Sequence, residues 1–162
     1  MIHPIRSCSG VPQCTYTPST SVTITSSYAK STFSHPNGWT QSGDGTLMTY
    51  VNPNGPEMVG VSRRVGVDGP GAISRVEAAE YNGHDGFAVT GSGQVKDATS
   101  GARIYEVTGT YTRGGQPVTF MMHSVDVPGG AEYVLVVRTP AASSAEMDPL
   151  MAALRASFQP AS

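Results

Sequence analysis

The sequence predicts an α+β fold, in which an antiparallel sheet of about six or seven strands carries one helix on each face. Glycine and proline, at 19 and 12 positions, interrupt the chain at short intervals, which is typical of many short strands joined by turns. Two segments, 70–81 and 143–158, instead repeat their apolar residues at helical spacing. The expected order is therefore hairpin, helix, meander, helix.

The first half of the chain predicts three strands and a helix. The expected strands are 31–34, 45–52 and 57–65, with turns at 36–38 and 53–56. Pro70 suits the first turn of a helix, so we expect this helix to run from Pro70 to Tyr81. Asn82 and Gly83 should end it, because glycine just past a helix readily takes the left-handed cap conformation.

The second half predicts an antiparallel meander. The expected strands are 87–90, 102–112, 116–127 and 131–138. Residues 91–93 (Gly-Ser-Gly) are expected to form a flexible loop. Segment 131–138 is apolar on both faces, so this strand should be central in the sheet and covered on both sides.

An apolar stripe and a capping pattern predict the last helix. The stripe consists of Met147, Leu150, Met151, Leu154 and Phe158. Its spacing fits a helix that packs on the sheet. Ser143, followed by Glu146 three residues later, matches a capping box at the helix start. Pro149 is best tolerated in a first turn, so a start at 148–149 is the alternative.

Six residues are expected to hold the core together rather than to bind a ligand. They are Trp39, Tyr105, Val136, Leu150, Leu154 and Phe158. Trp39 directly follows the turn at 36–38, where an aromatic ring usually closes one end of a core. Tyrosines on strands, such as Tyr105, are more often part of a core than of a binding pocket.

The N-terminal part of the chain differs in composition from the rest. Nine of the thirteen residues in 15–27 are serine or threonine, which is typical of a tether or stalk. Val22 and Ile24 alternate with threonines, so an edge strand is the competing interpretation. We therefore expect a Ser/Thr-rich tail or tether over 1–27, whose last part can pair with the sheet, and a single α+β domain over 28–160.

Composition and cysteine usage exclude some classes and leave others open. The net charge is −2 and the ten basic residues are scattered, so no nucleic-acid partner is expected. No stretch approaches the roughly 20 apolar residues of a membrane helix, so no transmembrane span is expected. Cys8 and Cys14 would close only a short loop as a disulfide, and a bridge and two free thiols remain equally open.

No catalytic or metal-binding residues are expected. His123, Ser124 and Asp126 are the residue types of a hydrolase, but neighbours on a strand point to opposite faces, so His123 and Ser124 should not meet. The histidines are widely separated, and His84-Asp85 is best explained as a solvated turn. Glu77 and Glu80 should lie on a solvated helix face. No cofactor is expected.

Several short segments resemble a known family. They are 33–39 (FSHPNGW), 50–55 (YVNPNG), 102–111, 133–140 and 156–158 (ASF). The chain resembles, over about residues 28–160, the extracytoplasmic C-terminal domains of actinobacterial serine/threonine protein kinases and related envelope lipoproteins. These domains have the PsbP-like sandwich fold, shared with photosystem extrinsic proteins and small Ran-binding proteins. The family usually has an aromatic residue near the start of the last helix, where this chain has Ala145 and Met147.

The resemblance implies a binding or accessory role outside the cytoplasm, and it offers no catalytic residues to carry over. Residues 5–8 also faintly resemble the end of a lipoprotein signal. The favoured hypothesis is a non-catalytic binding domain at the cell envelope that recognises a protein or small-molecule partner. The alternatives are a structural or assembly protein, oligomeric or virion-associated, and a hydrolase with a site built from loops. A cytoplasmic location is the alternative to the envelope.

Overall fold

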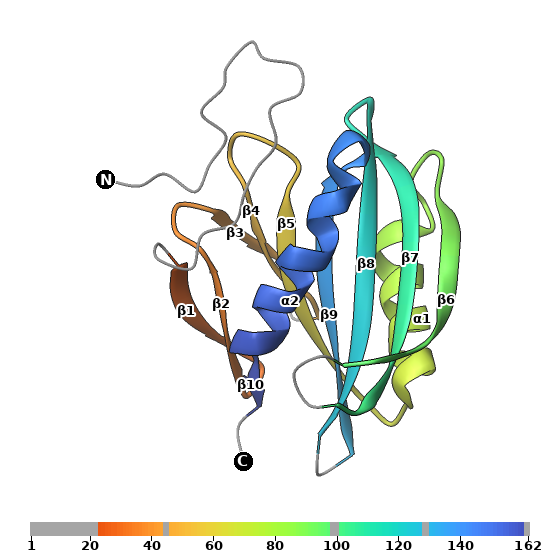
Figure 1. Cartoon of the computed structure of the whole chain (residues 1–162). Helices are drawn as coiled ribbons and strands as arrows, with labels where there is room; N and C mark the ends of the chain where they lie inside the picture. Colours follow the sequence, from red (N-terminus) through yellow and green to blue (C-terminus); the bar gives the residue numbers. More distant parts are fainter. Residues whose placement is uncertain (1–22, 44–45, 98–100, 128–129, 161–162) are drawn as a thin grey trace.

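The computed structural model describes residues 23–43, 46–97, 101–127 and 130–160, and its elements are drawn in Figure 1. The strands are β1 (Thr23–Tyr28), β2 (Ser31–Pro36), β3 (Thr40–Gly43), β4 (Met48–Val51), β5 (Met58–Val65), β6 (Ala88–Lys96), β7 (Arg103–Arg113), β8 (Gln116–Val127), β9 (Ala131–Pro140) and β10 (Gln159–Pro160). The helices are α1 (Gly69–Val76) and α2 (Met147–Ser157). A π-helical turn (Glu77–Tyr81) extends α1, and a 3₁₀ helix (Ala141–Glu146) precedes α2.

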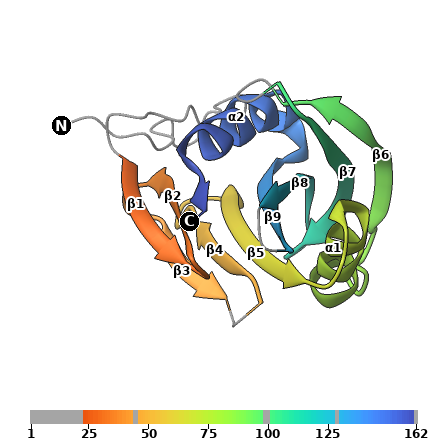
Figure 2. The same cartoon turned by 90° about the horizontal axis from the view of Figure 1, so that it is seen from below.

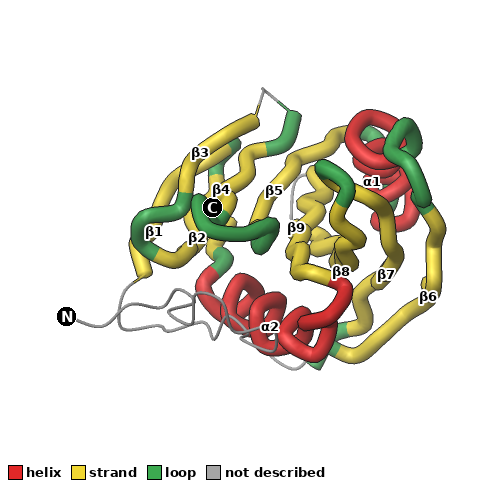
Figure 3. Tube along the Cα trace, turned by 90° about the horizontal axis from the view of Figure 1, so that it is seen from above, coloured by secondary structure: helices red, strands yellow, loops and turns green. Residues whose placement is uncertain are grey.

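A seven-stranded antiparallel sheet of order β3-β4-β5-β9-β8-β7-β6 forms the centre of the molecule. The two helices lie on opposite faces of this sheet, as the views from its two ends show (Figures 2 and 3). The predicted α+β sandwich is thereby confirmed. A smaller sheet, β1-β2-β10, lies beside α2.

Strand β9 occupies the middle of the long sheet, between β5 and β8. All ten of its residues are buried. This confirms the central position that the apolar pattern predicts for 131–138. The physical reason is that a strand covered by a helix layer on each face has no solvated side on which polar residues would be favoured.

Each face of the sheet has its own hydrophobic core. The core under α2 includes Phe33, Trp39, Tyr50, Val59, Leu135, Leu150, Leu154 and Phe158. The core under α1 includes Ile73, Val76, Tyr81, Val107, Tyr111, Phe120, Met122 and Val136. The predicted apolar stripe of the last helix thus packs on the sheet, and Trp39, which is 5% exposed, closes the α2 side.

Two strands differ from the prediction. β3 (Thr40–Gly43) was not predicted, because its four residues are all exposed and carry no apolar alternation. The predicted loop at 91–93 is wrong, since β6 runs through it from Ala88 to Lys96. β7 supplies a complete pairing partner for this glycine-containing segment, with one irregularity between Val89 and Gly91. Tertiary pairing therefore overrides the weak strand propensity of glycine.

The helix ends also differ from the prediction. Asp68 is the N-cap of α1, where its side chain accepts a hydrogen bond from the Gly71 amide. Gly83 does not take the left-handed cap, because the π-helical turn ends at Asn82 with φ −56°, and the left-handed glycine comes later, at Gly86. The Ser143–Glu146 capping box is wrong too: Ser143 lies in the 3₁₀ helix with φ −117°.

The first hairpin begins within the segment expected to be a tail. β1 pairs with β2 over its whole length, so ordered structure starts at Thr23, and residues 1–22 lie outside the described part. The loop consists of Ala29 and Lys30, which have φ values of +50° and +61°. The Tyr133 hydroxyl donates to both of their carbonyl oxygens, over 2.6 and 3.2 Å, and so anchors the loop to the sheet.

Replacing Ala29-Lys30 with Asn-Gly should raise the free energy of unfolding by about 1–2 kcal/mol. Two-residue hairpin loops with positive φ at both positions favour Asn-Gly, because glycine has no Cβ and the short polar side chain of asparagine tolerates the left-handed region better than alanine or lysine does. Urea unfolding followed by circular dichroism would measure the gain. Lys30→Ala is the matched control, since it keeps the Cβ and should leave the stability nearly unchanged. An Asn-Gly variant no more stable than the parent would contradict this account of the loop.

Candidate functional site

The long sheet opens between β7 and β8. The last residues that pair there are Glu106 and His123. Beyond that pair, β7 stays paired with β6 as far as Arg103, whereas β8 stays paired with β9 as far as Val127. The two strands therefore separate, while each stays paired with its other neighbour in the sheet. We call the space between them the β7–β8 opening.

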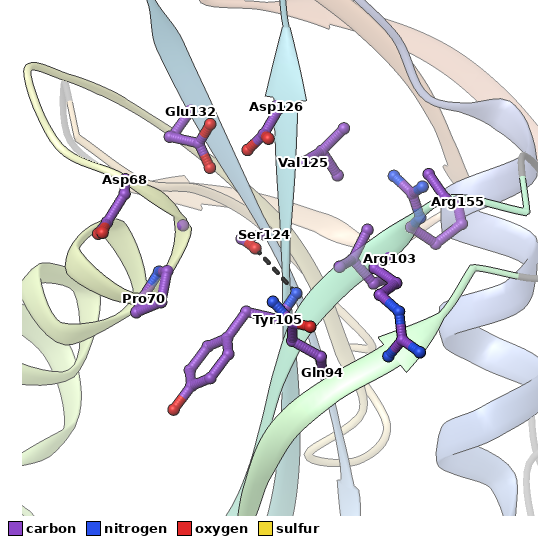
Figure 4. Close-up of a pocket in the computed structure, with 13 residues that line it drawn as sticks. Asp68, Pro70, Gln94, Arg103, Tyr105, Ser124, Val125, Asp126, Glu132 and Arg155 are labelled. Atoms are coloured by element: carbon purple, nitrogen blue, oxygen red, sulfur yellow. Dashed lines mark hydrogen bonds between the residues drawn. The ribbon is translucent and has the colours of Figure 1, made fainter.

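A cavity of about 610 Å³ occupies the β7–β8 opening. Its walls come from the N-terminus of α1, from β6 to β9 and from α2 (Figure 4). The Tyr105 amide donates to Ser124 Oγ over 3.2 Å, so a side chain replaces the backbone ladder at this point. Gly69 closes the α1 side, where a Cβ would come within 2.6 Å of Ser124 Oγ.

Three carboxyl groups line one end of the opening: Asp68 at the N-cap of α1, Asp126 on β8 and Glu132 on β9. We call them the carboxylate cluster. Asp126 and Glu132 are directly opposite each other in the β8–β9 register. Glu132 is only 7% exposed, and its Oε1 has no hydrogen-bond partner among the described residues. Burial, followed by the hydrogen bond and charge of Asp126 and the charge of Asp68, raises the pKa of Glu132 to about 8.

Basic groups line the other end of the opening. Arg155 of α2 is buried and forms an ion pair with Asp97, with 2.5 Å between Nη2 and Oδ2. Arg103, at the start of β7, is exposed and has no ion-pair partner in the part of the chain that the structure describes. The opening therefore presents negative groups at the α1 end and positive groups at the α2 end (Figure 4).

A second, smaller cavity of about 320 Å³ lies on the α2 side of the same strands. Here His123 Nε2 and Glu106 Oε2 are 2.7 Å apart, and His123 Nδ1 is buried with no hydrogen-bond partner in the part of the chain that the structure describes. Burial lowers the pKa of His123, and the hydrogen bond to Glu106 opposes that change. Ser124 lies on the α1 side instead, so His123 and Ser124 are on opposite faces of β8.

The residues expected to be structural are placed as follows. Val136, Leu150, Leu154, Phe158 and Trp39 are buried in the two cores. Tyr105 is half-buried against the α1-side core and also lines the β7–β8 opening. Cys8 and Cys14 lie outside the described residues. His84 is exposed, with its ring centre 4.7 Å from that of Tyr111.

Sequence reasoning missed the carboxylate cluster, although one signal for it was present. Strands 116–127 and 131–138 were expected to form a hairpin, and a short turn places Asp126 opposite Glu132. Like charges directly opposite each other in a sheet are unfavourable, which marks such a pair as unusual. The contribution of Asp68 had no comparable signal, because its position depends on how α1 packs on the sheet.

Comparisons by sequence give no relatives: no protein-family model and no curated protein matches the chain. Solved structures match in fold. The solution structure of cyanobacterial PsbP (CyanoP) from Synechocystis sp. PCC 6803 has a TM-score of 0.58 at 15% identity, covering 98% of this chain and 99% of that one. The Ran-binding protein Mog1p of Saccharomyces cerevisiae has a TM-score of 0.52 at 14% identity, covering 80% and 89%.

A third structure relates to the cell envelope. LpqN of Mycobacterium tuberculosis, described as involved in cell envelope biogenesis, has a TM-score of 0.48 at 14% identity, covering 78% of this chain and 80% of that one. Among the described residues, no helix has the length and hydropathy needed to cross a bilayer. Identities this low establish the fold alone, and on that basis the chain has the PsbP-like α-β-α sandwich fold that its sequence predicts.

Proposed function

We propose that this chain is a non-catalytic binding domain that accepts a small ligand, or a side chain of a protein partner, in the β7–β8 opening. The observation that carries the proposal is the opening itself. Its cavity of about 610 Å³ lies within the range of roughly 300–1,000 Å³ typical of small-molecule sites. Polar groups from six different elements line it, and such groups usually fix a ligand's orientation.

A binding role fits the opening better than hydrolysis does. Nucleophilic catalysis needs a nucleophile within hydrogen-bond reach of its base. Ser124 Oγ accepts a hydrogen bond from the Tyr105 amide on the α1 side, whereas His123 faces Glu106 on the α2 side. The sheet backbone separates the two side chains, so His123 cannot act as the base for Ser124.

We place this domain at the cell envelope, as an accessory domain held by a tether that ends where β1 begins, at Thr23. The support is the serine- and threonine-rich composition of 15–27 and the sequence resemblance to envelope domains. The fold is compatible with protein partners, since Mog1p, which shares it, is a Ran-binding protein.

A steric block at the rim of the opening tests the proposed function. The parent protein, labelled with ¹⁵N, would be screened by NMR against a library of amino acids, amines, carboxylates and neutral sugars. At least one compound should shift the amide signals of the residues that line the opening. Gln94→Trp should abolish these shifts, because Gln94 is an exposed residue at the rim and tryptophan is well tolerated on a strand.

Ser92→Trp is the matched control, since Ser92 is also exposed on β6 but does not line the cavity. It should retain the shifts in full. A library in which no compound perturbs the opening, or compounds that bind the Gln94→Trp variant as well as the parent, would overturn the proposal.

A further inference from the structure

Among the described residues, no side chain of the carboxylate cluster forms an ion pair. Arg64 is directly opposite Glu132 on β5, but its Nε donates to Ser62 Oγ over 3.0 Å. Asp68 caps α1 and so offsets the positive end of that short helix. Glu132 Oε1, buried and without a hydrogen bond, therefore remains an unmet acceptor that lines the opening.

A buried carboxylate oxygen without a partner is costly for the free protein and favourable for a ligand that supplies a donor. Metal ions need their ligands to converge closely, at about 2.3–2.6 Å for Ca²⁺. Among the described residues, no group of three acidic, histidine or cysteine side chains is close enough to hold a metal ion. An ammonium group demands less convergence, because its three N–H donors point to separate acceptors at hydrogen-bond distance.

The opposite end of the opening fits an anion. The guanidinium of Arg155 is already engaged with Asp97, whereas Arg103 is exposed and has no ion-pair partner in the described ranges. A free guanidinium binds a carboxylate through two parallel hydrogen bonds. Glu132 and Arg103 line the same cavity, from opposite ends, so one ligand in it can face both side chains.

We infer that the β7–β8 opening binds a small molecule or short peptide carrying both an ammonium group and a carboxylate, with the ammonium at the Asp68–Asp126–Glu132 end and the carboxylate against Arg103. This inference rests on the proposed function and narrows it to one class of ligand. Neither group alone satisfies both ends of the cavity, so the two together determine specificity.

Binding of this class of ligand is coupled to the release of a proton from Glu132. Glu132, with its pKa raised to about 8, is mostly protonated at pH 7 in the free protein. A bound ammonium favours the ionised carboxylate, so Glu132 must release its proton as the ligand binds. Affinity should therefore rise by about fiftyfold between pH 6 and pH 8 for a ligand whose own ammonium stays charged in this range.

Three related probes separate the two ends of the site in NMR titrations of the full chain. Nα-acetyl-lysine carries both groups, hexylamine only the ammonium, and N-acetyl-norleucine only the carboxylate. Nα-acetyl-lysine should bind at least about tenfold more tightly than either of the others, because each charged hydrogen bond contributes that much. Its affinity should rise from pH 6 to pH 8, as required by the release of the proton.

Two substitutions assign the ends of the site. Glu132→Gln should lower the affinity for both ammonium probes by about tenfold and remove its pH dependence. Arg103→Met should lower the affinity for Nα-acetyl-lysine but leave that for hexylamine unchanged. Glu80→Gln and Arg113→Met are matched controls outside the cavity and should change neither affinity. The amide spectra of all four variants should match that of the parent, which separates loss of binding from loss of fold.

Three results would overturn the inference: N-acetyl-norleucine binding as well as Nα-acetyl-lysine, an affinity independent of pH, or perturbation of the cluster by CaCl₂ at lower concentration than by the ammonium probes. If only neutral or anionic library compounds shift the signals of the opening, the proposed function stands and this inference fails. If no compound shifts them, both fail.

Discussion

Replacing Phe120 with alanine should lower the free energy of unfolding by about 3–5 kcal/mol, the usual cost of removing a buried aromatic ring. Phe120 is 0% exposed and lies in the core under α1. Its ring stacks on those of Tyr81 and Phe87, with ring centres 5.1 and 6.0 Å apart and nearly parallel planes. The alanine variant would leave a cavity in the core under α1, beside the rings of Tyr81 and Phe87.

Gly109 explains why the space left by Phe120 would remain empty. Gly109 is directly opposite Phe120 in the β7–β8 register, and a Cβ at this glycine would come within 2.5 Å of the Phe120 ring. The ring therefore covers the glycine, which has no side chain of its own to fill the space.

Urea unfolding at equilibrium, followed by circular dichroism, would measure the loss. Phe120→Leu is the matched variant, since it keeps most of the apolar volume and should cost no more than about 1.5 kcal/mol. A loss below 1 kcal/mol for Phe120→Ala would contradict the packing described for this core.

Breaking the Arg155–Asp97 ion pair is the second change with a large expected effect. Arg155→Met should lower the free energy of unfolding by about 3–5 kcal/mol, because it leaves a buried carboxylate without its cation. The two side chains are 9% and 4% exposed, and the pair links the end of β6 to α2 on the far side of the opening. The loss should persist at high salt, since buried pairs are screened much less than exposed ones.

A double variant tests whether the lost stability comes from leaving the Asp97 carboxylate buried without its cation. Arg155→Met combined with Asp97→Leu should recover most of the lost stability, because replacing a buried ion pair by apolar groups is often neutral. Urea unfolding of both variants at low and high salt would provide the comparison. A double variant less stable than Arg155→Met alone would show that Asp97 contributes through other contacts more than through Arg155.

Most of the architecture could be predicted from local patterns. Three patterns indicate which face of an element is buried: the alternation in 102–112, the segment 131–138 that is apolar on both faces, and the helical stripe that ends at Phe158. Such patterns depend only on residues a few positions apart, so a single sequence contains them in full. The same reasoning failed for β3 and β6, which carry no apolar alternation of their own and become strands by pairing with the next strand in the chain.

The candidate site could not be predicted from these patterns. Its position depends on the point where β7 and β8 separate, and nothing in either strand's own alternation marks Glu106 and His123 as the last pair. The carboxylate cluster combines Asp68 from a helix cap with two residues from a hairpin, more than fifty positions later in the chain. The contrast between its negative end and Arg103 also exists only once the strands are assembled.

By itself, the sequence determined the fold class, the central place of 131–138 and the helix faces that pack on the sheet, because these follow from the periodicity of side chains along one element. Only the tertiary structure decided where the sheet opens and which charges surround the opening. The physical reason is that burial of Glu132 beside Asp126 and Asp68 results from contacts between elements, and neither the desolvation nor the repulsion that raises its pKa exists in an isolated segment.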